Sequence, residues 1–161
     1  MNASGDVELV SETVGEDQYK ITARAQFDSQ AESVWPLLMN WERFIEIGLP
    51  GMTSDFRWLS GGPEVVPATF QFDMAGATLK EEIYEQQVDL DQGRYLLHYR
   101  TLEPALGIVD YDAALVLQQL PGTGTSFEAV RDVRFEPGAS PDMLADVVKA
   151  ETQYLKDFFA A

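Results

Sequence analysis

The chain has 161 residues and a formal net charge of −16, because 27 Asp and Glu residues face only 11 Lys and Arg residues. Such a surface repels phosphate backbones and anionic headgroups, so we expect no nucleic-acid binding and no stable membrane association. There is no cysteine and one histidine, His98. This composition excludes disulfides, thiolate metal sites and multi-histidine zinc sites, and we expect neither a metal nor a cofactor.

The length predicts one domain over residues 1–161, in which residues 1–5 are flexible. No run of about 18 apolar residues is present, and the first residues lack the basic and apolar regions of a signal peptide. We therefore expect a soluble, cytoplasmic protein, either a monomer or a homodimer. Two explanations of the acidity stay open: adaptation to high salt, where counterions screen self-repulsion, or the ordinary acidity of a cytosolic protein.

The first third of the chain has the pattern strand, strand, helix, helix. Ser29 and Glu32 have the spacing of a capping box, and Pro36 should shorten or kink the first helix. The predicted strands are 7–14 and 19–27, and the predicted helices are 30–39 and 41–47.

The middle of the chain alternates apolar and polar residues and contains turn signals rich in glycine, as in successive antiparallel hairpins. In one strand the apolar residues shift from Leu79 and Ile83 to Tyr84 and Val88, which predicts a β-bulge. The predicted strands are 56–59, 69–74, 78–89, 94–102, 108–120 and 125–135.

A long amphipathic helix is predicted over 140–159, with Ser140 as its N-cap and Pro141 at its first position. Apolar residues recur at spacings of three and four, which predicts one broad apolar face. These residues are Met143, Leu144, Val147, Val148, Tyr154, Leu155, Phe158 and Phe159. The fold class is therefore α+β, with a curved antiparallel sheet of about seven strands wrapped around the C-terminal helix.

Three stretches carry a resemblance to a known superfamily: AQFDSQAESVWPLLMNWERF, YEQQVDLDQGRYLLHY and RFEPGASPDMLADVVKAETQYLKDF. They resemble the opening strand and helix, a hairpin with an acidic first strand, and the closing strand and helix of the START-like helix-grip (SRPBCC) superfamily. This superfamily includes polyketide cyclases, lipid-transfer domains, birch-pollen-allergen-like proteins and plant hormone receptors. The resemblance implies a cavity between sheet and helix that binds a small hydrophobic or aromatic molecule, lipid or polyketide-like.

Glu85 is the first candidate for chemistry and the one candidate catalytic residue. It matches a glutamate that points into the cavity in the hormone-receptor branch, where burial would raise its pKa. The alternative is that Glu85 lies on the outer face as a solvated acid. Residues 106–108 match a gating loop of that branch, but Ala105-Leu106-Gly107 replaces its polar segment.

Arg131 alternates with apolar neighbours, so the pattern places it on the inner face, where Glu85 or a ligand carboxylate could pair with it. The alternatives are that a bulge turns Arg131 outward or that its side chain snorkels from the rim of the cavity. Tyr99 and Tyr111 match cavity-lining aromatic positions and could anchor a ligand through their hydroxyl groups, or simply fill the core. The further candidate ligand-binding residues are Trp58, Phe70, Phe72, Ala113, Val147 and Glu151, whereas His98 is expected on the outer face.

Three functions stay open at this point. The first is binding of a small hydrophobic molecule. The second is a cyclase, aromatase or dehydratase that uses Glu85 as general acid or base, with Tyr99, Tyr111 and Arg131 orienting a polyketide-like substrate. The third is a co-chaperone-like protein-interaction module of the same fold, which an exposed apolar patch outside the cavity would favour.

Overall fold

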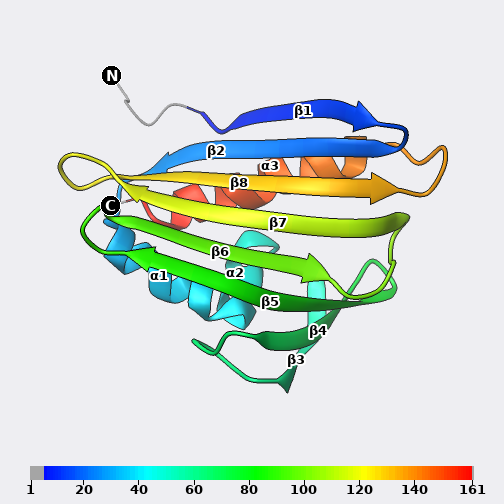
Figure 1. Ribbon diagram of the computed structural model, residues 1–161, viewed down its shortest axis with the longest axis horizontal. Helices are drawn as coiled ribbons and strands as arrows, with labels where there is room; N and C mark the ends of the chain where they lie inside the picture. The colour runs from blue at the N-terminus through cyan, green and yellow to red at the C-terminus, as the bar shows by residue number, and fades with distance from the viewer. Residues whose placement is uncertain (1–5, 161) are drawn as a thin grey trace.

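A computed structural model of the protein describes residues 6–160; the segment 1–5, predicted to be flexible, lies outside the described residues. One antiparallel sheet forms a layer in front of three helices (Figure 1). The strands are β1 (Glu8–Gly15), β2 (Gln18–Phe27), β3 (Thr53–Ser60), β4 (Ala68–Met74), β5 (Ala77–Asp89), β6 (Arg94–Thr101), β7 (Ile108–Gln119) and β8 (Thr125–Phe135). The helices are α1 (Ala31–Met39), α2 (Trp41–Gly48) and α3 (Asp142–Phe158).

The sheet has eight strands in the order β1-β2-β8-β7-β6-β5-β4-β3. From β3 to β8, each strand pairs with the next strand in the sequence, as in a meander. Strand β8 then pairs with β2, so the last strand lies beside the N-terminal hairpin of β1 and β2. The predicted bulge is confirmed: the register of β5 against β6 shifts between Ile83 and Glu85. The predicted fold class is confirmed as well.

The three helices lie on the same face of the sheet and divide it between them (Figure 1). Helix α3 packs against β2 and α2, while α1 contacts β6 and β7. The larger hydrophobic cluster lies under α1 and α2 and includes Phe27, Phe44, Phe70, Leu97 and Leu115. The C-terminal helix therefore covers only one half of the sheet, and α1 and α2 cover the other half.

The predicted apolar face of α3 is too broad. Met143, Tyr154 and Phe158 are exposed, with 78%, 47% and 49% of their surface accessible. The residues that α3 buries are Val148, Glu151, Thr152 and Leu155. Two of these four residues, Glu151 and Thr152, are polar, so the buried face of this helix contains hydrogen-bonding groups as well as apolar side chains.

Both predicted helix caps need correction. Helix α1 begins at Ala31, so Ser29 lies one residue too early to cap it, and the Ala31 N–H donates instead to the Gln119 side chain on β7, at 2.8 Å. The Ser29 hydroxyl donates to the Phe159 carbonyl. In α3 the cap position belongs to Pro141, although the Ser140 hydroxyl still accepts from the Asp142 N–H at 3.2 Å.

Candidate functional site

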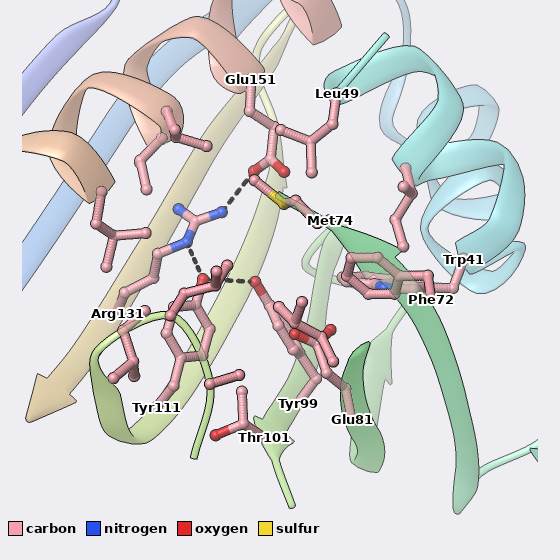
Figure 2. A pocket seen from close by; sticks show the side chains of 18 of the residues that line it. Trp41, Leu49, Phe72, Met74, Glu81, Tyr99, Thr101, Tyr111, Arg131 and Glu151 are labelled. Carbon is pink, nitrogen blue, oxygen red and sulfur yellow. Dashed lines mark hydrogen bonds and ion pairs between the residues drawn. The ribbon is translucent and has the colours of Figure 1, made fainter. Parts of the chain in front are cut away.

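A cavity of about 100 Å³ lies between the inner face of the sheet and the helices α2 and α3 (Figure 2). Strands β4 to β8 supply its floor because their inward-facing residues alternate with outward-facing ones. The lining is mainly apolar, and the residues are Trp41, Ile45, Leu49, Phe72, Met74, Leu79, Glu81, Tyr99, Thr101, Glu103, Ala105, Leu106, Ile108, Tyr111, Arg131, Leu144, Val147, Val148 and Glu151.

The cavity reaches the surface beside the loop between β6 and β7. Glu103 and Leu106 line the cavity and are themselves exposed. Lys80 Nζ lies 3.6 Å from Glu103 Oε2 at this end. Leu144, near the start of α3, also belongs to the lining. The segment expected to match a gating loop therefore does border the cavity.

Four polar side chains form a continuous chain of interactions along one wall (Figure 2). The Tyr99 and Tyr111 hydroxyl oxygens are 2.9 Å apart. The Arg131 Nε–H donates to the Tyr111 hydroxyl at 2.6 Å, and Arg131 Nη2–H donates to Glu151 Oε1, also at 2.6 Å. The tyrosine pair carries two hydroxyl protons, of which one lies between the two oxygens. The other remains free to be donated to a ligand.

The Arg131–Glu151 ion pair is almost completely buried, since the two side chains are 2% and 10% exposed. A buried guanidinium requires a partner, and α3 supplies it from the opposite layer. Gly48 at the end of α2 leaves room for the Glu151 side chain, because a Cβ at this position would lie 2.8 Å from the Glu151 Cγ. The predicted burial of Arg131 is confirmed, but its partner is Glu151.

Glu81 is the buried polar side chain of the cavity that sequence reasoning missed. It lies on β5 opposite Thr101 of β6 and Phe70 of β4, on the inner face of the sheet. It is only 6% exposed. Within the described residues, no hydrogen bond or ion pair involves its carboxyl group. The signal was present in the sequence, because Leu79, Glu81 and Ile83 alternate at period two.

Burial sets the ionisation of these groups. The pKa of Glu81 is raised to about 8, first by loss of solvation and then by the charge of the nearby Glu151, while Arg131 acts in the opposite direction. Burial also raises the pKa of Glu151, opposed by the charge and hydrogen bond of Arg131. The pKa values of Tyr99 and Tyr111 are likewise raised, first by burial, so both hydroxyl groups are neutral near pH 7.

The prediction that Glu85 points into the cavity is wrong. The bulge after Ile83 places both Tyr84 and Glu85 on the outer face, where Glu85 Oε1 lies 3.7 Å from His98 Nε2. Gln87 donates a hydrogen bond to the same carboxylate. The His98 ring stacks on Tyr84, which places His98 on the outer face as predicted. Glu85 is thus a partly solvated member of a surface cluster.

The remaining predicted site residues divide into two groups. Tyr99, Tyr111, Phe72, Val147 and Glu151 all line the cavity, as does Arg131. Three others do not: Phe70 and Ala113 are buried in the main core, and Trp58 on β3 packs partly buried against Phe70. Strand alternation placed Phe70 and Ala113 on the inner face, but the cavity occupies only part of that face.

Two buried nitrogen atoms of lining residues lack a hydrogen-bond partner within the described residues: Trp41 Nε1 and Arg131 Nη1. Both are donors only. A buried unpaired donor is costly, so the two atoms, together with the unpaired Glu81 carboxyl, leave unused hydrogen-bonding capacity in the residues of one cavity. Residues 6–160 contain no group of His, Cys, Asp and Glu side chains arranged to hold a metal ion.

Known structures share this fold. A truncated norcoclaurine synthase from Thalictrum flavum is 14% identical, with a TM-score of 0.63 and coverage of 91% of this chain and 96% of that one. The major latex-like protein 151 of Panax ginseng is 14% identical, with a TM-score of 0.66 and coverage of 90% and 99%. The lipid transfer and protein localization domain of human StarD13 is 11% identical, with a TM-score of 0.69 and coverage of 99% and 87%.

These similarities confirm that the chain has the START-like helix-grip fold that the resemblance implied. The sequence itself matches no protein-family profile and no curated protein. Among the described helices, none is both long enough and apolar enough to cross a membrane.

Proposed function

We propose that this protein binds a small hydrophobic molecule in the cavity between the sheet and helices α2 and α3. The observation that carries the proposal is the lining itself: an apolar chamber whose residues include polar groups without partners. Ligand sites of proteins have this composition, with apolar walls for affinity and a few polar groups for orientation. The structural neighbours add support, because one of them is a lipid transfer and protein localization domain.

The volume limits what the cavity can enclose. An engineered cavity of about 150 Å³ in another protein binds benzene, so about 100 Å³ accommodates no more than a single ring or a short branched chain. A larger molecule would place one end inside and extend past Leu106 and Leu144 to the surface. We therefore propose a compact aromatic or aliphatic ligand, or the compact end of a longer one.

A cavity-filling substitution tests this function. Val147→Phe adds a ring at a lining position of α3, and we expect it to lower the affinity for single-ring ligands such as toluene at least tenfold, because the added ring occupies their space. The measurement is ligand-induced change in the protein's NMR spectrum. Met143→Phe is the matched control on the same helix, at an exposed position.

The two variants separate specific binding from loss of fold. Both should give a native circular dichroism spectrum. If Val147→Phe binds toluene as well as the original protein and Met143→Phe do, or if none of the three binds it, the cavity is not a ligand site.

A second candidate function rests on Glu81. A general acid or base works best with a pKa near the working pH, and burial places the pKa of this carboxyl at about 8. The proposed enzyme of the cyclase or dehydratase type would therefore use Glu81 in place of Glu85, with Tyr99 and Tyr111 orienting the substrate. Turnover that survives Glu81→Gln would remove this candidate.

A further inference from the structure

The charged groups at the cavity are unequal in number. Glu81 and Glu151 are two buried carboxyl groups, and Arg131 is the one buried guanidinium among the described residues of the lining. Arg131 already forms an ion pair with Glu151 at 2.6 Å. Glu81 remains, 6% exposed and without a hydrogen bond or ion pair to any described residue.

A carboxyl group in this position has two ways to avoid the cost of a buried, unpaired charge. It can hold its proton, or it can ionise when an opposite charge arrives beside it. Loss of solvation raises the pKa of this carboxyl group to about 8, which favours the protonated state. A ligand that brings a positive charge would favour the second state, and the two buried carboxylates would then balance two buried cations.

The groups that face Glu81 from the surrounding elements favour such a ligand. Arg131 on β8 and Glu151 on α3 neutralise each other, and Tyr99 on β6 and Tyr111 on β7 are neutral hydroxyl groups. Helix α2, the adjoining Leu49 and strand β4 contribute apolar or aromatic side chains: Trp41, Ile45, Leu49, Phe72 and Met74. Glu103 at the mouth adds negative charge but is exposed and paired with Lys80.

The aromatic side chains strengthen the preference. The rings of Trp41 and Tyr99 both line the cavity, and their centroids are 4.7 Å apart. The face of an aromatic ring attracts a cation, and it does so more strongly away from water. A cation in this cavity would thus lie among aromatic as well as aliphatic side chains.

From this arrangement we infer that the cavity selects small hydrophobic amines, whose ammonium group pairs with the Glu81 carboxylate while the apolar part fills the chamber. The inference rests on the proposed function, since it names the ligand class of the same cavity. The unpaired donors Arg131 Nη1 and Trp41 Nε1 present the competing possibility, an anionic or carbonyl ligand. A carboxylate ligand, however, would add a third carboxyl group to Glu81 and Glu151, and Arg131 is the one buried guanidinium among the described lining residues that is available to pair with them.

Three probes of similar size and different charge test the inference: benzylamine, benzyl alcohol and benzoate. We expect benzylamine to bind at least tenfold more tightly than benzyl alcohol at about pH 8, and benzoate to bind most weakly. The affinity for benzylamine should rise by up to tenfold per pH unit between about pH 6 and about pH 8, because the ammonium pairs with the ionised form of Glu81. The affinity for benzyl alcohol should not rise in this way. Isothermal titration calorimetry measures all three.

Two variants assign the effect to one carboxyl group. Glu81→Gln keeps the shape of the side chain and should abolish both the preference for benzylamine over benzyl alcohol and its pH dependence. Glu85→Gln, on the same strand but on the outer face, should leave both unchanged. Native circular dichroism spectra confirm that each variant is folded.

The possible outcomes separate the inference from the function on which it rests. If the three probes bind alike, or if benzoate binds best, the amine preference is wrong and the hydrophobic cavity remains. A preference for benzylamine that survives Glu81→Gln also overturns the inference. If none of the probes binds the folded protein, the proposed function fails together with the inference.

Discussion

Glu81 shows how one buried carboxyl group connects stability to pH. Its pKa is raised from an ordinary value near 4.5 to about 8, first by loss of solvation. Below about pH 4.5 the group is protonated in both the folded and the unfolded chain. Between about pH 4.5 and about pH 8 the unfolded chain releases this proton while the folded chain holds it, so the free energy of unfolding falls as the pH rises.

This linkage gives a prediction for Glu81→Gln. Glutamine cannot ionise, so the variant should lose less stability than the original protein between about pH 5 and about pH 8, by up to several kcal/mol at the upper end. Urea denaturation at a series of pH values measures the difference. Glu85→Gln is the control, because that side chain is partly solvated on the outer face. Parallel pH profiles for Glu81→Gln and the original protein would show that Glu81 is not held protonated in the fold.

At the scale of secondary-structure elements, the bulge in β5 explains what sequence reasoning achieved and where it failed. Alternation predicted the strands, and the shift of apolar residues after Ile83 predicted the bulge. A register shift of one residue moves every later side chain of the strand to the other face, so the bulge turns Glu85 outward. This consequence of the predicted bulge was missed. The resemblance to the hormone-receptor branch of the START-like superfamily then assigned to Glu85 the buried position that Glu81 occupies.

The partner of Arg131 could not be deduced from the sequence either. Alternation on β8 placed Arg131 inside, and the spacing on α3 placed Glu151 between Val148 and Leu155. Nothing in either pattern states that these two elements meet, because strand order and helix placement depend on contacts between residues far apart in the chain. The Arg131–Glu151 pair can be recognised only from the folded structure, in which β8 lies beside β2 and α3 packs against β2.

The Arg131–Glu151 pair joins β8 to α3, and breaking it should loosen the contact between the two layers. We expect Arg131→Met to cost about 3–5 kcal/mol in the free energy of unfolding, because it leaves the Glu151 carboxylate buried without a partner. The double variant Arg131→Met with Glu151→Met should recover most of this loss, since it removes both charges. Chemical denaturation measures each variant.

Arg134 provides the control on the same strand. Its ion pair with Asp110 lies on the outer face, with both side chains substantially exposed. We expect Arg134→Met to cost about 1 kcal/mol or less. A loss for Arg131→Met no larger than this would show that the buried pair does not hold α3 on the sheet.

At the scale of the whole molecule, the excess of acidic residues should make stability depend on salt. The net charge is −16, so the ion pairs that the structure describes, such as Arg24 with Glu128, leave most of the acidic side chains uncompensated. Their mutual repulsion is screened over about 30 Å at 0.01 M salt and over about 3 Å at 1 M salt. We expect the thermal unfolding midpoint to rise over this range of NaCl concentration.

A charge-reduced variant distinguishes screening from a general effect of salt on hydrophobic burial. Glu12→Gln, Glu42→Gln and Asp146→Asn together remove three negative charges from exposed positions. Because the variant repels itself less, its midpoint should be higher than that of the original protein at 0.01 M salt and should rise less toward 1 M. Equal salt dependence for both proteins would assign the effect to apolar burial, and the acidic surface would then need no explanation in terms of high-salt adaptation.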